Sequence, residues 1–427
     1  MKKRSFFLCV AALLTAHQFV KAQNAPAATP AAKPASVPTV TVYGFVRNDL
    51  NYDSRQNVFV REGQLDLYPK DIDLVNGKDY NAQPQLNILG ILTRLGVKGN
   101  GPDAFKAKTS YVLEGDFFGQ ADVNIGSLRI RHGYVKLDWE KSALTLGQTW
   151  YPFFIPECFP GVVNFNTGIP IAPFGWAGQI KYTAKLSAAT SLSFTAYKPR
   201  EFAVANVNPA DNTNAASMNA ALPDLNAHFQ YKSDKFLLGA QADLSVLNPY
   251  TKYTAANGAA INTERVTGLS FMAYTKITAK KFSIKAQTVF GQNTMHWVMM
   301  GGYYGYKPTA TSVETYKPAK TTAVWADIYG NGKKVSPALF IGYSQNNGAD
   351  AGATAAYGRM VGVSGRGIKS LARVAPRVDI YSGKLKFGTE LEFTTAEYGT
   401  RSNNGKVSGP TDKVQNVRFT FSTVFSF

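Results

Sequence analysis

Eight basic residues lie where polar side chains alternate with apolar ones along the chain. They are Arg47, Arg94, Lys98, Arg129, Arg131, Arg373, Arg377 and Arg418. Arg94 shares its parity with Gly96, and Arg418 shares its parity with Thr420. In an extended chain, residues of one parity lie on one face, so several segments would present cations on their polar faces. Because guanidinium groups bind carboxylates through paired hydrogen bonds, this set predicts an attraction for anions.

No residues are spaced for nucleophilic or metal chemistry. His132, His228 and His296 lie far apart, and none is near a serine or cysteine in a nucleophile motif. Four histidines and two cysteines leave no material for a Cys/His metal cluster or a disulfide framework. We interpret Cys158 as a buried small side chain, and we expect no enzymatic activity, no metal and no cofactor.

The composition is that of a folded, aromatic-rich and basic protein. Its 427 residues include 46 Lys+Arg against 28 Asp+Glu, which gives a formal net charge of +18, and 45% are hydrophobic. That hydrophobic content excludes a disordered chain. A mean hydropathy of -0.16 argues against a helical membrane protein. The positive charge suggests binding to nucleic acid, but we expect the leader of the chain to direct the protein out of the cytosol, away from most such partners.

The leader has the three parts of a secretory signal peptide. Lys2–Arg4 are positive, Phe6–Leu14 are apolar, and Val20–Ala22 form a small-residue cleavage site. A transmembrane anchor is the alternative, but the apolar run of about ten residues is too short to span a bilayer. We expect residues 1–22 to be removed, and the loss of three lysines and one arginine lowers the net charge from +18 to +14.

The remaining chain divides into a linker and one long domain. Residues 23–38 are rich in Ala and Pro and have no periodic apolar face, which is typical of a linker. Residues 39–427 have a hydrophobic period of two, which predicts strands of about ten residues. The predicted strand starts are Thr39, Gln85, Asp103, Ser127, Ser142, Ala177, Thr190, Leu225, Lys235, Arg265, Lys281, Thr321, Ser336, Ile368, Lys384 and Lys413.

The connections between these strands alternate in length. Short turns are predicted at Gly99–Gly101, Glu140-Lys141, Ser187-Ala188, Ser233-Asp234, Ala279-Lys280, Gly330–Gly332 and Ser382-Gly383, and long polar loops include residues 54–84, 150–176, 199–223 and 296–320. A transmembrane barrel has this asymmetry, and a soluble sandwich has no reason for it. No segment after the leader offers the roughly 20 apolar residues of a spanning helix. We therefore predict an all-β, transmembrane, antiparallel barrel of about sixteen strands, with eighteen as the alternative.

Several motifs resemble those of Gram-negative outer-membrane porins. Arg94–Gly99 is similar to the RLGxKG strand motif of the general porins. Leu113–Gly119, Leu128–Tyr134 and Leu146–Trp150 follow in order at porin-like spacing. Together with Tyr43–Arg47 they resemble the DcaP-like trimeric porins.

This resemblance, which is clear over residues 40–183, implies a sixteen-stranded barrel in the outer membrane that is usually a homotrimer. It also implies that the third external loop, residues 150–176, folds into the lumen. The constriction residues would then be Trp150, Tyr151, Phe153 and Glu157. The function implied is a water-filled channel for passive diffusion of small polar solutes. Expected partners are further copies of the chain, outer-membrane lipid, lipopolysaccharide and small polar or anionic solutes, but no nucleic acid.

The sequence departs from the general porins at positions that affect selectivity. The third loop contains one acid, Glu157, and no base, and Gln148 stands where those porins have an arginine. We expect a weaker transverse field and a more positive lumen. An arginine facing lipid near the midplane costs about 2 to 4 kcal/mol, so we assign all eight cations to the lumen. For any single arginine, solute contact and bracing by Glu114 or Asp116 both stay open.

As a set, the eight cations predict a preference for anions or dicarboxylates. One alternative is a barrel without transport, such as an adhesin or structural anchor that uses its long loops. An outer-membrane hydrolase is a weaker alternative. The aromatic- and proline-rich third loop favours the channel, because a purely structural barrel has no need to fold a loop inward.

Overall fold

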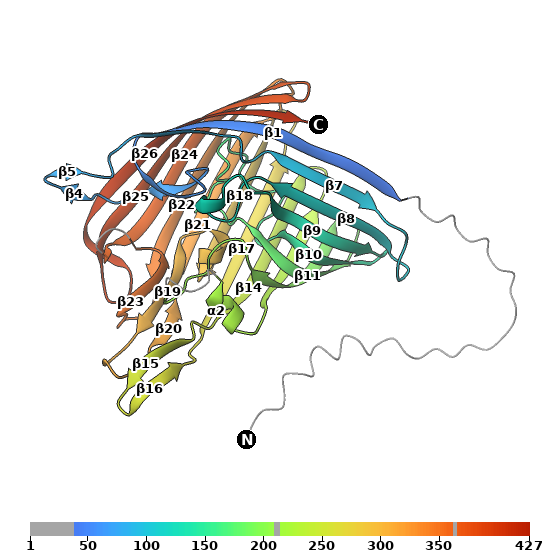
Figure 1. Cartoon of the computed structure of the whole chain (residues 1–427). Coiled ribbons are helices and arrows are strands. Elements are labelled where there is room, and N and C mark those ends of the chain that lie inside the picture. Colours follow the sequence, from blue (N-terminus) through green and yellow to red (C-terminus); the bar gives the residue numbers. More distant parts are fainter. Residues whose placement is uncertain (1–37, 209–213, 362–364) are drawn as a thin grey trace, which may run out of the picture. The chain divides into compact units, whose positions relative to one another are not determined.

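Sixteen antiparallel strands close into a barrel in the computed structural model of the chain (Figure 1). The structure describes residues 38–208, 214–361 and 365–427, so the predicted signal peptide and all of the predicted linker except Pro38 lie outside the described residues. The barrel strands are β1 (Thr39–Asp53), β7 (Arg94–Asn100), β8 (Lys108–Asp116), β9 (Arg129–Asp138), β10 (Ser142–Trp150), β11 (Trp176–Lys185), β12 (Thr190–Pro199), β13 (Asp224–Lys232), β14 (Phe236–Leu247), β17 (Val266–Thr278), β18 (Phe282–Gln292), β21 (Lys320–Gly330), β22 (Val335–Gly348), β24 (Gly367–Ser382), β25 (Leu385–Arg401) and β26 (Val407–Ser426).

The barrel closes where the first strand meets the last. β26 pairs with β25 on one edge and with β1 on the other, in a register that places Phe45 opposite Ser426 and Asp53 opposite Arg418. The other edge of β1 pairs first with β7 and then with an extra strand, β6 (Gln85–Leu89). β6 and β7 therefore occupy one position in the wall, and the prediction of sixteen strands is confirmed over eighteen.

The predicted strand starts agree closely with the observed strands. The largest differences are at Asp103, where β8 begins at Lys108, and at Lys413, where β26 begins at Val407. The predicted turn at residues 99–101 is misplaced, because β7 continues to Asn100. The chain reverses instead between Ala104 and Ala107, whose backbone groups bond to each other.

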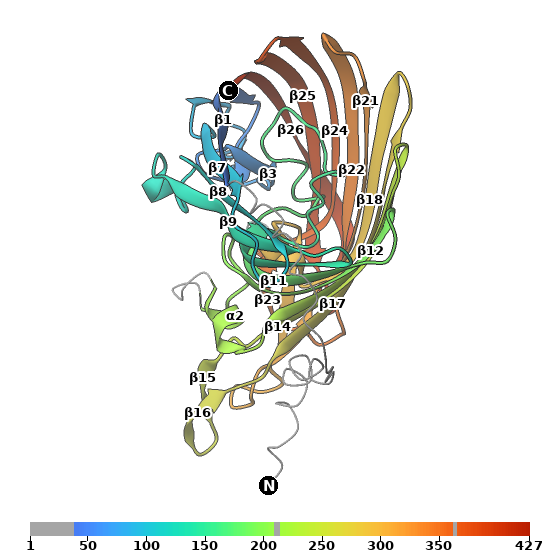
Figure 2. The same ribbon diagram turned by 90° about the vertical axis from the view of Figure 1, so that its right-hand side faces the viewer.

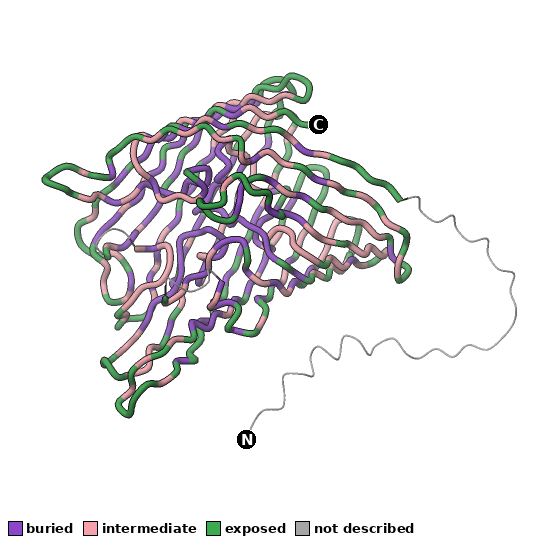
Figure 3. The backbone as a smooth tube through the Cα atoms, in the orientation of Figure 1, coloured by how far each residue is buried: buried purple, intermediate pink, exposed green. Residues whose placement is uncertain are grey.

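Side chains alternate between an apolar outer face and a polar inner face. In β1, Val46 and Tyr52 are exposed on the outside, whereas Asp49 and Asn51 are buried inside. The same alternation runs along most strands (Figure 3). A soluble protein buries its apolar face and exposes its polar one, so this reversed arrangement requires an apolar medium around the barrel.

The two ends of the barrel differ, as predicted. Seven short turns form the short-turn end, and the opposite, long-loop end holds the other connections. These connections contain β2 (Asn57–Val60), β3 (Leu65–Pro69), β4 (Leu74–Val75), β5 (Lys78–Asp79), η1 (Asp122–Asn124), α2 (Ala215–Asn219), β15 (Thr251–Ala255), β16 (Gly258–Asn262), η2 (Thr294–Trp297), β19 (Gly301–Tyr306), β20 (Thr315–Pro318) and β23 (Ala355–Arg359). Within the described ranges, no helix is both long and apolar enough to cross a bilayer.

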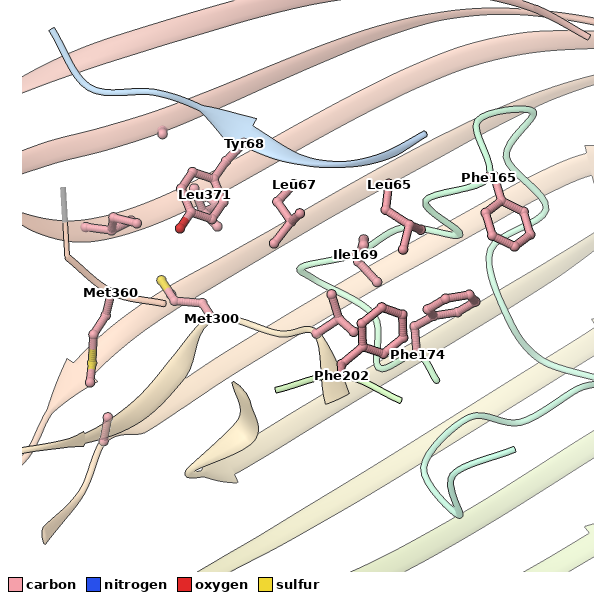
Figure 4. Packing of buried hydrophobic residues seen from close by; sticks show 14 of the residues in the cluster. Leu65, Leu67, Tyr68, Phe165, Ile169, Phe174, Phe202, Met300, Met360 and Leu371 are labelled. Carbon is pink, nitrogen blue, oxygen red and sulfur yellow. The ribbon is translucent and has the colours of Figure 1, made fainter. Parts of the chain in front are cut away.

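An apolar core lies inside the barrel rather than between layers. It is formed mainly by three loops that turn inward from the long-loop end: loop 1 (residues 54–84), loop 3 (residues 151–175) and loop 6 (residues 293–319). Figure 4 shows Leu67 of loop 1, Ile169 of loop 3 and Met300 of loop 6 in the same cluster. Only the inward course of loop 3 was predicted.

The outward apolar face gives a test of the orientation of the barrel wall. Ile180 is in the middle of β11 and is 59% exposed. Ile180→Arg should lower the free energy of unfolding by about 2 to 4 kcal/mol, because a charge would face hydrocarbon. The measurement is denaturant unfolding in lipid vesicles followed by tryptophan fluorescence. Ile180→Leu is the control, and equal stability of the two variants would contradict an outward, lipid-facing position.

Candidate pore constriction

Loop 3 crosses the interior of the barrel from one wall to the opposite one (Figure 2). It leaves β10 at Trp150 and returns to the neighbouring strand β11 at Trp176. Between these points, the Val163 N–H donates to Glu390 Oε2 of β25 at 2.7 Å. The Gly161 N–H donates to Asp327 Oδ2 of β21 at 2.8 Å. These bonds fix the loop within the lumen, because an unpaired backbone donor there would be costly.

Aromatic stacking explains why this loop folds inward. Trp150 stacks on Phe154 with ring centroids 4.0 Å apart and on Trp176 at 4.5 Å. Phe153 stacks on Trp297 of loop 6 at 4.3 Å. Tyr151 and Phe153 are fully buried. These two predicted constriction residues therefore belong to the apolar core and have no surface open to the lumen.

Glu157, the one acid of loop 3, lies toward the short-turn end. Its Oε1 accepts a hydrogen bond from Lys232 Nζ of β13 at 2.7 Å, and both side chains are exposed. Glu157 therefore does not face a wall of arginines across the lumen. This placement agrees with the weak transverse field expected from the sequence.

Loop 1 is a second inward loop, and it packs against the last strands of the barrel. All five residues of β3 are buried, and Leu65, Leu67 and Tyr68 enter the apolar core. Arg418 Nη1 donates to the Gly63 carbonyl at 2.8 Å, and the Tyr398 hydroxyl donates to the Pro69 carbonyl at 2.7 Å. The wall thus bonds the backbone of the loop along its inward course.

Loop 6 fills the remaining space with the segment Trp297–Met300. The Phe174 N–H donates to the Trp297 carbonyl at 2.9 Å, which joins loop 6 to loop 3. The inward courses of loops 1 and 6 were not predicted. The available signal was a short group of apolar residues in each loop, Leu65, Leu67 and Tyr68 in loop 1 and Trp297–Met300 in loop 6, which would be costly to leave in water.

Arg373 joins loop 1 to loop 3. Its guanidinium donates to the Leu67 carbonyl of loop 1 at 2.7 Å and to the Ile169 carbonyl of loop 3. It also lies 3.1 Å from Glu392 and 3.5 Å from Asp66. Burial raises the pKa of the Asp66 carboxyl, although Arg418 and Arg373 act in the opposite direction. One buried side chain therefore holds both loops.

Seven of the eight predicted pore-lining cations are the arginines, and each has a carboxylate partner. The pairs and shortest charged distances are Arg47–Asp49 2.8 Å, Arg94–Glu114 3.5 Å, Arg129–Asp116 2.7 Å, Arg131–Glu114 2.8 Å, Arg373–Glu392 3.1 Å, Arg377–Asp327 2.8 Å and Arg418–Asp53 2.7 Å. Arg129 also pairs with Glu201 of the long loop after β12, and burial raises the pKa of that carboxyl. Each arginine therefore has a carboxylate close enough to brace it against the wall.

The eight cations do not share one environment. Arg129, Arg373 and Arg418 are buried beneath the inward loops. Lys98 is exposed, with its Nζ 5.2 Å from the centre of the Tyr43 ring. The other four line a cavity of about 410 Å³ beside loop 3: they are Arg47, Arg94, Arg131 and Arg377. Of these four, Arg131 and Arg377 are themselves buried, so Arg47 and Arg94 present the most guanidinium surface to the cavity.

Two smaller cavities continue around loop 3 toward the short-turn end. One of about 300 Å³ shares Trp150 and Phe154 with the first cavity, and one of about 350 Å³ shares Lys285 with it. A separate cavity of about 680 Å³ lies at the long-loop end and is lined by Arg61, Arg200 and other residues. Within residues 38–208, 214–361 and 365–427, no group of three His, Cys, Asp or Glu residues could hold a metal ion.

No protein-family model and no curated protein matches the sequence. Solved structures do match its fold. The outer membrane channel DcaP of Acinetobacter baumannii matches with a TM-score of 0.64 at 19% identity, over 91% of this chain and 97% of that one. The anion-selective porin from Comamonas acidovorans matches with a TM-score of 0.55 at 10% identity, over 92% and 100%. OmpT of Vibrio cholerae, expressed in the outer membrane, matches with a TM-score of 0.52 at 12% identity, over 91% and 98%. The chain therefore has the fold of the outer-membrane porins, as the motifs indicated.

Removal of the Arg373 guanidinium should destabilise the inward loops. Arg373→Met would leave Glu392 buried without its counter-charge, and we expect a loss of about 3 to 5 kcal/mol of stability. The measurement is the midpoint of denaturant unfolding, with protease sensitivity of loop 1 as a second readout. Lys413→Met, an exposed change in the same wall, is the control. If the two variants unfold at the same midpoint, Arg373 does not hold the loops.

Cys158 gives a test of the buried position of loop 3. Its Sγ lies 3.2 Å from the Thr275 carbonyl oxygen, to which it donates, and burial raises the pKa of the thiol to about 11. At pH 7 to 8 the thiol is therefore protonated and shielded, so a polar maleimide should label the folded protein poorly. Heat-denatured protein should react fully, as measured by mass spectrometry. Equal labelling of both forms would contradict an inward loop 3.

Proposed function

We propose that this chain forms a water-filled channel in the outer membrane through which small polar solutes diffuse passively, with a preference for anions such as dicarboxylates. The observation that supports this proposal is the porin fold with an inward third loop, beside which lies a cavity lined by charged side chains. The cavity of about 410 Å³ is lined by six basic and two acidic side chains, which gives it an excess of positive charge. Cation-lined pores favour anions. No catalytic step is part of this proposal.

The assembly and location follow from the same proposal. Residues 1–22 would act as a cleaved signal peptide and residues 23–38 as a linker to the barrel. The short-turn end would face the periplasm, and the long loops would face the exterior and its lipopolysaccharide. A homotrimer is supported by the resemblance and by unequal wall height. β8 and β10 have 9 residues each, whereas β25 has 17 and β26 has 20, and the low side of the wall suits contact with another copy of the chain.

A barrel without transport is the second candidate. The observation that favours it is the amount of apolar packing inside the barrel, where loops 1, 3 and 6 meet. In such a protein the interior core would stabilise the external loops as a binding surface. The two candidates differ in one property, which is whether ions pass through the folded protein.

Conductance distinguishes these candidates. The purified barrel in a planar bilayer under a salt gradient should give stable conductance steps, and the reversal potential should indicate anion preference. A folding control is needed, because a misfolded barrel would also pass no current. The control is electrophoresis with and without heating, in which a folded barrel changes its mobility when heat unfolds it. A folded barrel that passes no current would contradict the channel and favour the loops as an interaction surface.

A further inference from the structure

The two kinds of basic residue occupy different parts of the barrel. Seventeen lysines, and no arginine, lie in the seven short turns or within five residues of them. They are Lys98, Lys106, Lys108, Lys136, Lys141, Lys181, Lys185, Lys232, Lys235, Lys276, Lys280, Lys281, Lys285, Lys333, Lys334, Lys384 and Lys386. The same segments contain only six acids: Asp103, Asp138, Glu140, Asp234, Asp327 and Asp379. The short-turn end is therefore strongly basic.

Seven of these lysines face the interior. They line the three cavities around loop 3, and they are Lys136, Lys181, Lys232, Lys235, Lys276, Lys285 and Lys386. Their positions along the strands agree with an inward direction. Lys276 lies two residues after the buried Tyr274, and Lys285 lies two residues after the buried Ser283, so each pair shares the inner face. We call this set the lysine vestibule. It lies between loop 3 and the short-turn end.

The lysine vestibule is less neutralised than the arginine wall. Lys136, Lys232 and Lys386 each have a carboxylate within 4.0 Å, namely Asp138, Glu157 and Asp379. The other four, Lys181, Lys235, Lys276 and Lys285, have no carboxylate at that distance in the part of the chain that the structure describes. In contrast, each of the seven arginines lies within 4.0 Å of at least one carboxylate, with Glu114 shared by Arg94 and Arg131, so the field of these arginines is largely cancelled.

From this difference we infer that the lysine vestibule, and not the arginine wall, sets the anion preference of the channel. The inference rests on the proposed function. Unpaired charges in a cleft with low-dielectric walls concentrate counter-ions, whereas tightly paired charges add little net potential. Ammonium groups are point charges without the planar fork of arginine, so the vestibule should select solutes by charge rather than by shape. Small multivalent anions, such as di- and tricarboxylates, are the class that it fits.

The position of the vestibule adds a directional property. Its charges lie at one end only, and salt screens charge over about 10 Å at 0.1 M ionic strength. Raising the salt concentration on the short-turn side should therefore weaken anion preference more than the same change on the long-loop side. A selectivity filter of arginines in the middle of the barrel would respond equally from both sides.

The test compares two triple variants that remove the same charge. Lys181→Gln, Lys276→Gln and Lys285→Gln together remove three charges from the vestibule. Lys252→Gln, Lys317→Gln and Lys406→Gln together remove three exposed charges from the long-loop end. Glutamine keeps length and polarity, and heat-modifiable mobility checks the folding of each. The vestibule variant should lower the anion-to-cation permeability ratio roughly threefold, and the control should leave it near the wild-type value.

The outcomes separate this inference from the proposed function. If the unmodified barrel passes no current, the channel itself is contradicted. If it conducts but the vestibule variant keeps the wild-type reversal potential, the selectivity lies elsewhere and the inference is overturned. An equal fall in both triple variants also overturns it, because net charge alone would then explain the preference. A loss confined to the vestibule variant, with the side-dependent effect of salt, supports it.

Discussion

The pairing of every barrel strand on both edges is the constraint on which the rest of this structure depends. Backbone groups facing hydrocarbon have no water to bond, so β1 must meet β26 and the sheet must close. Closure creates an outer face that must be apolar because it meets hydrocarbon, and an inner face that carries the polar side chains. This explains the reversed burial along the strands. It also leaves an interior that the wall residues do not fill. Loops 1, 3 and 6 occupy that interior, so the core is supplied by the connections.

Burial under these loops governs how the arginines can act. A guanidinium removed from water is tolerated only with a counter-charge or full hydrogen bonding, and each wall arginine has such a partner. Arg373 and Arg418 also bond loop backbone, which makes them structural links between wall and loop. The lysines at the short-turn end remain partly solvated, so they can keep an unpaired charge. The distribution of Arg and Lys thus follows the depth of each position.

The wall could be predicted almost completely from the sequence, because a period of two is a local property. Strand number, strand starts and the inward parity of Arg47, Arg94 and Arg418 all follow from it. The interior could be predicted only in part. Loop 3 was recognised by its resemblance, but the three apolar residues of loop 1, Leu65, Leu67 and Tyr68, are too few to show where they pack. Their partners are also remote: Arg373 reaches Leu67 across 306 positions of sequence.

Such remote bonds have a consequence for assembly. Loop 1 is made early in synthesis, yet Arg373, Tyr398 and Arg418, which bond it, belong to the last three strands. Contacts between residues so far apart in sequence form only after the chain between them has lost conformational entropy. Loop 1 therefore cannot reach its final position until β24, β25 and β26 are in place. The same three strands complete the ring. Ring closure and filling of the interior are therefore expected to be a single late and cooperative event.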